Sequence, residues 1–227
     1  MQDHQFSKPL PSPLNKDTSV LKLWFFPKTS QETPISFNEM KWAKKLTARR
    51  QKEYKYSRGY ARLALSKLFD VDPLQIPLHA EPGKPPKLAE GWGHMSLSHC
   101  SDALIIGWSR KKLGVDLEKS NRTFNAQKLV NRFFSKSEQE ILKISNEQDL
   151  SQNVLSRWVI KEAAIKWQEG SIYEDLQQWD LAENYQWAYH KSRQFKINTR
   201  ILYYKNWIIG IAYNRNHYLN SPILCIN

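Results

Sequence analysis

The amino-acid sequence predicts an α+β fold of two halves, each with a helix packed on a small antiparallel sheet. Three observations support this prediction. A helix-capping pattern introduces a helical stretch in each half, at Ser36 and at Ser135. Short segments that alternate between apolar and polar residues follow each helical stretch, as in strands with one buried face. The hydrophobic share of 41% is ample for a packed core.

The chain is expected to divide into three parts. Residues 1–19 contain several prolines and serines without apolar periodicity, so we expect a loose N-terminal arm. Residues 20–112 form the predicted N-terminal half, and residues 113–227 form the C-terminal half. No residue-level repeat relates the two halves, so the sequence itself does not prove a structural duplication.

The first half is predicted to open with a strand at residues 20–26. Ser36 and Glu39 have the spacing of a capping box, and the helix that they open is expected to restart near Thr47 and run to Leu68. The next stretch, up to Lys87, is rich in proline and is expected to be mostly loop. Further strands are predicted at residues 95–98, 103–108 and 114–118.

The second half begins near the last of these strands. Four apolar side chains then share one helical face: Leu129, Val130, Phe133 and Phe134. Ser135 and Glu138 repeat the capping-box spacing and predict another short helix. The remaining predicted elements are a polar loop at residues 146–152, the clearest helix of the chain at residues 154–168, stopped by Gly170, and a terminal sheet within residues 179–213.

The composition argues against a membrane-spanning or disulfide-rich protein. The longest apolar runs, residues 103–108 and 207–213, fall far short of the ~20 residues that a bilayer requires. The mean hydropathy of −0.65 agrees. Cys100 and Cys225 cannot form a disulfide framework, and two lone thiols are typical of a reducing cytosol. With no signal-peptide pattern at the start of the chain, we expect a cytoplasmic protein.

The charge distribution predicts an anionic partner. The chain carries 34 Lys and Arg against 22 Asp and Glu, a formal net charge of +12. Residues 41–67 hold ten basic residues against Glu53 alone, so this window carries most of the excess. Such a segment attracts polyanions, whether nucleic acid, a phosphorylated cofactor or an acidic protein. A solvated helix face would have the same composition, so charge alone does not choose among them.

Two acidic residues on a predicted strand are the first candidates for chemistry. Asp116 and Glu118 are two positions apart, so both project from the same face of the strand. Carboxylate oxygens are the ligands that Mg²⁺ prefers, and the ion commonly keeps waters and substrate phosphates in its remaining positions. Two carboxylates on a strand are equally consistent with an exposed polar face.

The helix at residues 154–168 adds a third carboxylate. Trp158, Glu162 and Lys166 fall at successive i, i+4 positions and line one side of this helix, so Glu162 could complete the metal shell. An ordinary ion pair between Glu162 and Lys166, worth ~0.3–0.5 kcal/mol, is the simpler interpretation of the helix alone. His99, at the end of a predicted strand, could equally be a histidine that bonds a backbone carbonyl.

Five segments occur together in the order and spacing of one enzyme family. They are Gly83-Lys84-Pro85, Ser96 to His99, Gly114 to Glu118, Arg132 to Ser135 with Glu138, and Trp158 to Lys166. In this combination the chain resembles the 4′-phosphopantetheinyl transferases, in particular the larger, monomeric surfactin-synthetase-activating type. Residues 49–62 are similar to the N-terminal basic helix of the enterobactin-type members, although Leu65-Ser66 stands where many members have Leu-Arg.

The resemblance implies a pseudo-dimer of two similar α+β halves, with coenzyme A and magnesium in the cleft between them. It implies that Asp116, Glu118 and Glu162 hold Mg²⁺, with Mn²⁺ as a possible substitute. The residues that it assigns to the coenzyme A phosphates are Arg58, Lys84, Ser98, His99 and Lys166. It leaves open whether Arg49, Lys52 or Arg62 joins Arg58 at the 3′-phosphate.

The implied activity is that of a holo-[carrier protein] synthase. A serine hydroxyl of an apo acyl or peptidyl carrier protein attacks the β-phosphorus of coenzyme A, and 3′,5′-ADP departs. Glu162 is the candidate general base, directly or through a metal-bound water, and Lys166 would neutralise or protonate the departing oxygen. The basic excess would attract the acidic surface of a carrier from fatty acid, polyketide or nonribosomal peptide biosynthesis.

Two alternatives from other classes use the same residues. A nucleic-acid-binding protein would use the basic window, in which Tyr54, Tyr56 and Tyr60 could stack on bases. A metal-dependent nuclease would use the carboxylates as well. Neither explains the segments around Lys84 and His99, so we expect a carrier protein and coenzyme A as partners, with no nucleic acid and no membrane.

Overall fold

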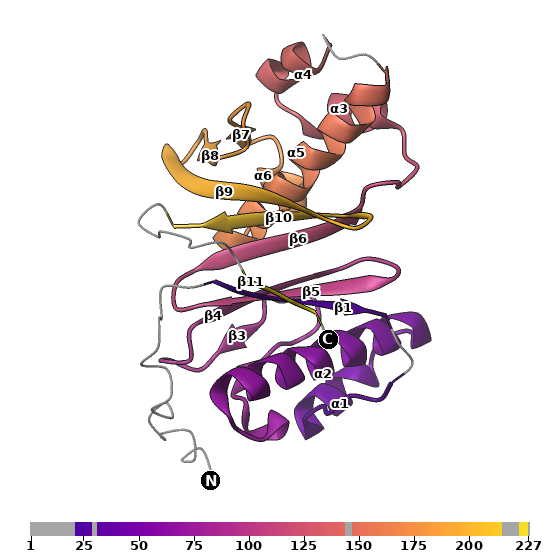
Figure 1. The fold of residues 1–227 in the computed structure, drawn as a ribbon, viewed down its shortest axis with the longest axis vertical. Coiled ribbons are helices and arrows are strands. Elements are labelled where there is room, and N and C mark those ends of the chain that lie inside the picture. The colour runs from indigo at the N-terminus through magenta and orange to yellow at the C-terminus, as the bar shows by residue number, and fades with distance from the viewer. Residues whose placement is uncertain (1–20, 29–30, 144–146, 215–222, 227) are drawn as a thin grey trace. The chain divides into compact units, whose positions relative to one another are not determined.

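The structure is a computed structural model, and it describes residues 21–28, 31–143, 147–214 and 223–226 (Figure 1). It divides the chain into two units, and each is described by itself. The first unit contains the described parts of residues 1–97, 101–111 and 218–227, and the second contains those of residues 98–100 and 112–217. Both units combine helices with antiparallel strands, which confirms the predicted α+β class. The predicted N-terminal arm lies outside the described residues.

The first unit is built on a four-stranded sheet in the order β11-β1-β5-β4. The strands are β1 (Lys22–Pro27), β4 (His94–His99), β5 (Ala103–Ser109) and β11 (Ile223–Ile226). β1 and β5 are antiparallel, with Trp24 opposite Ile106. These apolar runs form strands at the places that the sequence predicts for β1, β4 and β5, within two residues at each end.

The last strand departs from the predicted division of the chain. The sequence assigns all residues after 113 to the second half, whereas β11 pairs in parallel with β1, with Leu23 opposite Leu224. A short apolar run has no local signal for the sheet that it will join, because strand pairing depends on tertiary partners. Residues 98–100 also belong to the second unit, and the remaining division falls between residues 111 and 112.

Two helices complete the core of the first unit. α1 (Phe37–Ala43) begins at the predicted capping box, in which the backbone N–H of Ser36 donates to Glu39 Oε2 at 2.7 Å. α2 (Ala48–Phe69) follows Thr47, also as predicted. Its buried residues Ala61 and Leu65 belong to the same core cluster as the sheet residues Leu104 and Ile106. The proline-rich stretch that follows holds a short 3-10 helix, η2 (Pro73–Gln75), and two two-residue strands, β2 (Leu78–His79) and β3 (Lys87–Leu88).

The second unit is built on a five-stranded antiparallel sheet in the order β6-β10-β9-β8-β7. Its strands are β6 (Leu113–Lys119), β7 (Trp179–Leu181), β8 (Trp187–His190), β9 (Phe195–Tyr204) and β10 (Trp207–Tyr213). The predicted terminal sheet is therefore confirmed, and the strand carrying Asp116 and Glu118 lies at its edge. In the register of β6 and β10, Asp116 is opposite Gly210.

Four helices accompany this sheet: α3 (Ala126–Phe133), α4 (Lys136–Lys143), α5 (Glu147–Gln168) and α6 (Ile172–Asp175). The second predicted capping box is present, because the Glu138 N–H donates to Ser135 Oγ at 3.3 Å and the Ser135 N–H donates to Glu138 Oε2 at 3.2 Å. α5 covers the sheet with Val159, Ile160 and Ala163, which are fully buried. No helix in the described ranges is long and apolar enough to cross a bilayer.

The ends of α5 correct two sequence expectations. The polar stretch predicted as a loop at residues 146–152 is helical from Glu147 onward. Asp149, Ser151 and Gln152 are exposed in its first turns, and Leu150 among them packs against the core. At the other end, the left-handed conformation that ends the helix belongs to Glu169, with φ of 60°, rather than to Gly170.

Candidate active site

The two acidic residues of β6 lie on the strand face that α5 covers. A side chain added at Gly114 would collide with the backbone of α5 at Ala163, so this position of β6 faces the helix. Side chains two positions apart on a strand point to the same face. Asp116 and Glu118, at two-residue intervals from Gly114, share its face. Asp116 is 2% exposed, and Glu118 is partly buried.

Glycines let α5 come unusually close to the two strands beneath it. A Cβ at Gly114 would lie 2.5 Å from the backbone nitrogen of Trp167, and a Cβ at Gly210 would lie 2.6 Å from the carbonyl carbon of Val159. Either distance is shorter than real Cβ contacts allow, so only glycine fits at these two positions. The close approach brings Glu162 and Lys166 of α5 within reach of β6.

Asp116 is the centre of the resulting cluster. Lys166 Nζ lies 2.6 Å from Asp116 Oδ1 and 3.9 Å from Glu162 Oε2. Ser98, at the end of β4, donates its hydroxyl to the same Asp116 Oδ1 at 2.6 Å. Asp116 Oδ2 is buried and has no hydrogen-bond partner within the described part of the chain. Of the predicted site residues, Ser98, Asp116, Glu162 and Lys166 are thus brought together.

The pKa values of Glu162 and Glu118 are raised next to Asp116. Burial and the negative charge of Asp116 together raise the pKa of Glu162 to about 8, against the opposing effect of Lys166. Burial and Asp116 also raise the pKa of Glu118, although Arg122 donates a hydrogen bond to the Glu118 carboxylate. Lys166 and Arg122 together therefore do not balance the negative charge that three carboxylates would concentrate here.

The chemistry of these donors fits a hard divalent cation. Carboxylate oxygens are the ligands that Mg²⁺ prefers. A bound Mg²⁺ would also reduce the repulsion between the carboxyl groups and give the unpaired Asp116 Oδ2 a partner. In the ranges that the structure describes, no three side chains of His, Cys, Asp or Glu already converge as a metal-binding group. Lys166 instead supplies the positive charge beside Asp116. The three-carboxylate metal site therefore stays a prediction that the donor chemistry supports.

The other predicted phosphate ligands lie on three different elements of the chain. His99 follows Ser98 at the end of β4 and is exposed. Lys84 lies in the first unit, in the connection between β2 and β3, where its ammonium is 2.9 Å from Glu81 Oε2 and is largely exposed. Arg49 and Lys52 are exposed near the start of α2.

Two basic residues of α2 are buried, whereas Arg49, Arg50, Lys52 and Lys67 are exposed. Arg58 is 7% exposed and Arg62 is 2% exposed. Arg58 Nε donates to the carbonyl of Ala80 at 3.2 Å, and its guanidinium lies over the ring of Tyr54. Burial lowers the pKa of Arg58. Arg58 therefore reaches the interior of the first unit rather than standing on a solvated helix face.

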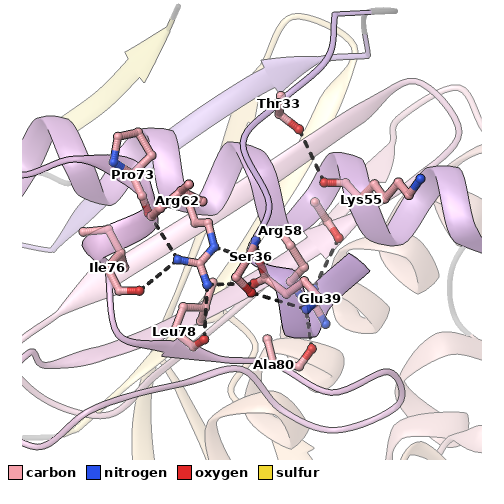
Figure 2. A network of polar contacts seen from close by, with 12 residues as sticks. Thr33, Ser36, Glu39, Lys55, Arg58, Arg62, Pro73, Ile76, Leu78 and Ala80 are labelled. Atoms are coloured by element: carbon pink, nitrogen blue, oxygen red, sulfur yellow. Dashed lines mark hydrogen bonds and ion pairs between the residues drawn. The ribbon is translucent and has the colours of Figure 1, made fainter. Parts of the chain in front are cut away.

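The hydrogen bonds of Arg62 exclude it as a phosphate ligand. Its Nε and Nη2 bond the two carboxylate oxygens of Glu39 at 2.8 and 3.1 Å. Its remaining N–H groups donate to the carbonyls of Pro73, Ile76 and Leu78 (Figure 2). A guanidinium has five N–H donors, and these five bonds use all of them. No donor is left for a phosphate.

Sequence analysis missed a buried lysine next to Glu162. Lys161 is fully buried, bonds the carboxylate of Glu138, and donates to the carbonyl of Leu176 at 2.8 Å. Burial lowers its pKa. The signal was available, because Lys161 interrupts an apolar helical face and the capping box had already singled out Glu138. This pair fixes α5 to α4 and α6, which keeps the adjacent Glu162 turned toward β6.

Part of the chain matches a known protein family. Residues 112–212 match the family model of the 4′-phosphopantetheinyl transferase superfamily, whose members transfer phosphopantetheine to carrier proteins. The matched segment runs from β6 to β10 and includes Asp116, Glu118, Glu162 and Lys166. It gives no support to the nucleic-acid-binding or nuclease alternatives. No curated protein matches the chain.

Proposed function

Because residues 112–212 match the family model of the 4′-phosphopantetheinyl transferase superfamily, we propose that this protein transfers 4′-phosphopantetheine from coenzyme A to a serine of an apo acyl or peptidyl carrier protein. The observation that carries the proposal is the acidic cluster within the matched segment. Lys166 Nζ contacts both Asp116 and Glu162 where α5 packs on β6, and Asp116 keeps a buried oxygen without a hydrogen-bond partner among the described residues. A bound cation would relieve the repulsion among these carboxyl groups and that of Glu118.

Asp116, Glu118 and Glu162 would hold the cation, which we propose to be Mg²⁺ or Mn²⁺. When bound, the ion would neutralise the pyrophosphate of coenzyme A and so reduce its repulsion of an incoming oxygen. Ser98 donates a hydrogen bond to Asp116 and so orients that carboxylate. The rest of the catalysis would come from positioning and charge neutralisation by the chain's own groups.

Glu162 is the proposed general base. The serine oxygen would form a bond to the β-phosphorus while its proton passes to the Glu162 carboxylate. In the metal-free chain, burial with the charge of Asp116 raises the pKa of Glu162 to about 8, so this carboxylate takes up a proton more readily than an exposed one does. The side chain is 15% exposed, so it is screened from bulk water yet reachable by a substrate.

Lys166 is the proposed partner of the leaving group. As the phosphorus–oxygen bond of the pyrophosphate breaks, 3′,5′-ADP takes the electron pair, and Lys166 would neutralise or protonate the departing oxygen. Its side chain is 29% exposed and already contacts the acidic cluster. We further propose that His99 in the second unit and Lys84 and Arg58 in the first contact the phosphates of coenzyme A.

Intact-mass measurement of a carrier protein tests the proposal. The protein is incubated with an apo carrier, coenzyme A and Mg²⁺, and the carrier should gain the mass of one phosphopantetheine. The gain should disappear with a chelator and in Asp116→Ala. The control Glu174→Ala removes an exposed carboxylate of the same unit and should keep full transfer. A panel of apo carriers left unmodified, with DNA cleaved in the same buffer, would favour the nuclease alternative.

A further inference from the structure

Lys84 is carried by a hairpin that is too short to hold its own shape. β2 and β3 are paired at two positions only, Leu78 opposite Leu88 and His79 opposite Lys87. An isolated two-stranded hairpin is marginal in water even when its strands are longer. The connection between them, residues 80–86, contains Lys84. Something outside the hairpin must fix its place.

Helix α2 supplies that support through three side chains, which we call the α2 clamp: Tyr54, Arg58 and Arg62. They are spaced four residues apart and therefore lie along one side of the helix. Each is nearly buried, and each donates hydrogen bonds to backbone carbonyls of the segment that leads into the hairpin.

The bonds of the clamp are spread along residues 73–80. Arg62 donates to Pro73 at 3.1 Å, to Ile76 at 2.9 Å and to Leu78 at 3.4 Å (Figure 2). Tyr54 Oη donates to the carbonyl of Ala80 at 2.7 Å, and Arg58 Nε donates to the same carbonyl at 3.2 Å. The backbone is thus held up to the residue where the connection begins.

Glu39 fixes the orientation of Arg62. Its two carboxylate oxygens take the Nε and Nη2 groups of Arg62, and the pair is 0% and 2% exposed. Glu39 is itself held by the backbone N–H of Ser36 in the capping box of α1. The planar guanidinium therefore has one orientation, in which its other N–H groups point at the carbonyls of the segment.

The path from the clamp to Lys84 is short. Ala80 is fully buried, and Lys84 follows it by four residues. A turn fixes those residues, because the Lys84 N–H donates to the carbonyl of Glu81 at 3.1 Å and Gly83 adopts φ of 81°, which favours glycine. A shift of the backbone at Ala80 would therefore move the Lys84 ammonium.

We propose that the α2 clamp positions Lys84 for coenzyme A, with Arg62 acting as a positioning residue that does not touch the substrate. The inference rests on the proposed function and adds to it a role for buried residues of the first unit. Lysine cannot replace Arg62 in this role, since an ammonium group has three donors at one point instead of a planar fork of five.

Steady-state kinetics with coenzyme A as the varied substrate and saturating apo carrier test the proposal. Arg62→Lys keeps the positive charge beside Glu39 and loses most of the carbonyl bonds. We expect the KM for coenzyme A to rise about tenfold while kcat stays within about twofold, since removal of a binding contact alone acts on KM. Tyr54→Phe removes a single hydroxyl bond to Ala80 and should raise the KM about threefold.

A double-mutant cycle with Lys84→Ala separates positioning from general loss of stability. If Arg62 acts through Lys84, the double variant R62K/K84A should have the same KM as K84A alone. The control is Leu65→Ala, which removes a fully buried side chain of α2 that does not bond the segment. It should destabilise the protein and leave the KM for coenzyme A unchanged. Additive effects of R62K and K84A would overturn the proposal.

Hydrogen exchange tests the α2 clamp independently of the proposed function, because the measurement needs no substrate. Amides of residues 79–88 should exchange at least about tenfold faster in Arg62→Lys than in the wild type, and should not do so in Leu65→Ala. Unchanged exchange in R62K would overturn the clamp even if the protein is a transferase. A wild-type protein that transfers nothing would contradict the proposed function, with the exchange result still deciding whether the clamp holds the hairpin.

Discussion

The first unit and the second unit each bury a cluster of charged side chains, and the clusters differ in how fully their polar atoms are paired. Around Arg62 and Glu39, all five guanidinium N–H groups have acceptors and both carboxylate oxygens accept bonds. Around Asp116, the carboxyl groups outnumber the single ammonium of Lys166, and one oxygen is left without a partner among the described residues.

The difference separates a structural role from a chemical one. A buried charge whose bonds are all made within the chain holds segments together and has nothing left for a ligand. A buried acidic cluster with an orphaned oxygen and raised pKa values is typical of a site that receives a cation or a proton. Replacing one acidic residue in each cluster should therefore have opposite effects on stability and on transfer.

The largest expected effect is the loss of transfer in Glu162→Gln. Removal of the proposed base and metal ligand should lower kcat on the order of 10⁴-fold, the upper range for a general base. The free energy of unfolding should stay the same or rise, because one source of like-charge repulsion is gone. The intact-mass assay and urea denaturation measure the two quantities, with the exposed Glu174→Gln as the control. Near-normal turnover in E162Q would remove Glu162 from the mechanism.

The second effect is the loss of stability in Glu39→Gln. This change leaves Arg62 as a buried charge without its counter-ion, which should lower the free energy of unfolding by about 3–5 kcal/mol. Urea denaturation measures the loss. The control is Glu140→Gln, which breaks an exposed pair with Lys143 and should lower stability by less than about 1 kcal/mol. Equal losses in the two variants would show that the buried pair is not structural.

The third effect concerns the glycine that lets α5 approach β6. Gly114→Ala should push the helix away from the strand, lowering stability by about 1–3 kcal/mol and lowering transfer as well. Val115→Ala, on the other face of the same strand, is the control: it leaves a cavity and should lower stability without an equal loss of transfer. If G114A keeps full kcat despite its lower stability, the close approach is not needed for the chemistry.

The smallest effect is a pH dependence of the metal-free protein. The pKa of Glu162 is raised from 4.5 to about 8, so the folded chain binds more protons than the unfolded chain between these values. Stability should therefore fall as the pH rises through this range, by at most about 1.4 kcal/mol per pH unit for one proton. Urea denaturation with a chelator at pH 6 and pH 7 measures the slope. E162Q should have a smaller slope; identical slopes would contradict the assigned shift.

Local signals predicted much of the fold. Both capping boxes form hydrogen bonds at the expected residues, and the strand alternation placed Asp116 and Glu118 on the same face. Each of these features depends on neighbours within about four residues, which the sequence displays directly.

Local sequence patterns did not predict the features that depend on tertiary partners. The basic spacing of α2 looks the same whether an arginine is solvated or, like Arg62, buried against Glu39. The pairing of β11 with β1 and the burial of Lys161 also depend on residues far away in the chain. In the candidate site, the sequence predicted a cation shared by three carboxylates, which stays a prediction, but not that Lys166 would bond Asp116.

Binding of Mn²⁺ in the presence of coenzyme A, followed by electron paramagnetic resonance, tests most directly whether Asp116, Glu118 and Glu162 share one divalent cation. We predict one bound Mn²⁺ per wild-type chain, lost in Asp116→Asn and in Glu162→Gln and retained in Glu174→Gln. Equal Mn²⁺ binding by the wild type and by both cluster variants would contradict the assignment of the acidic cluster as a metal site.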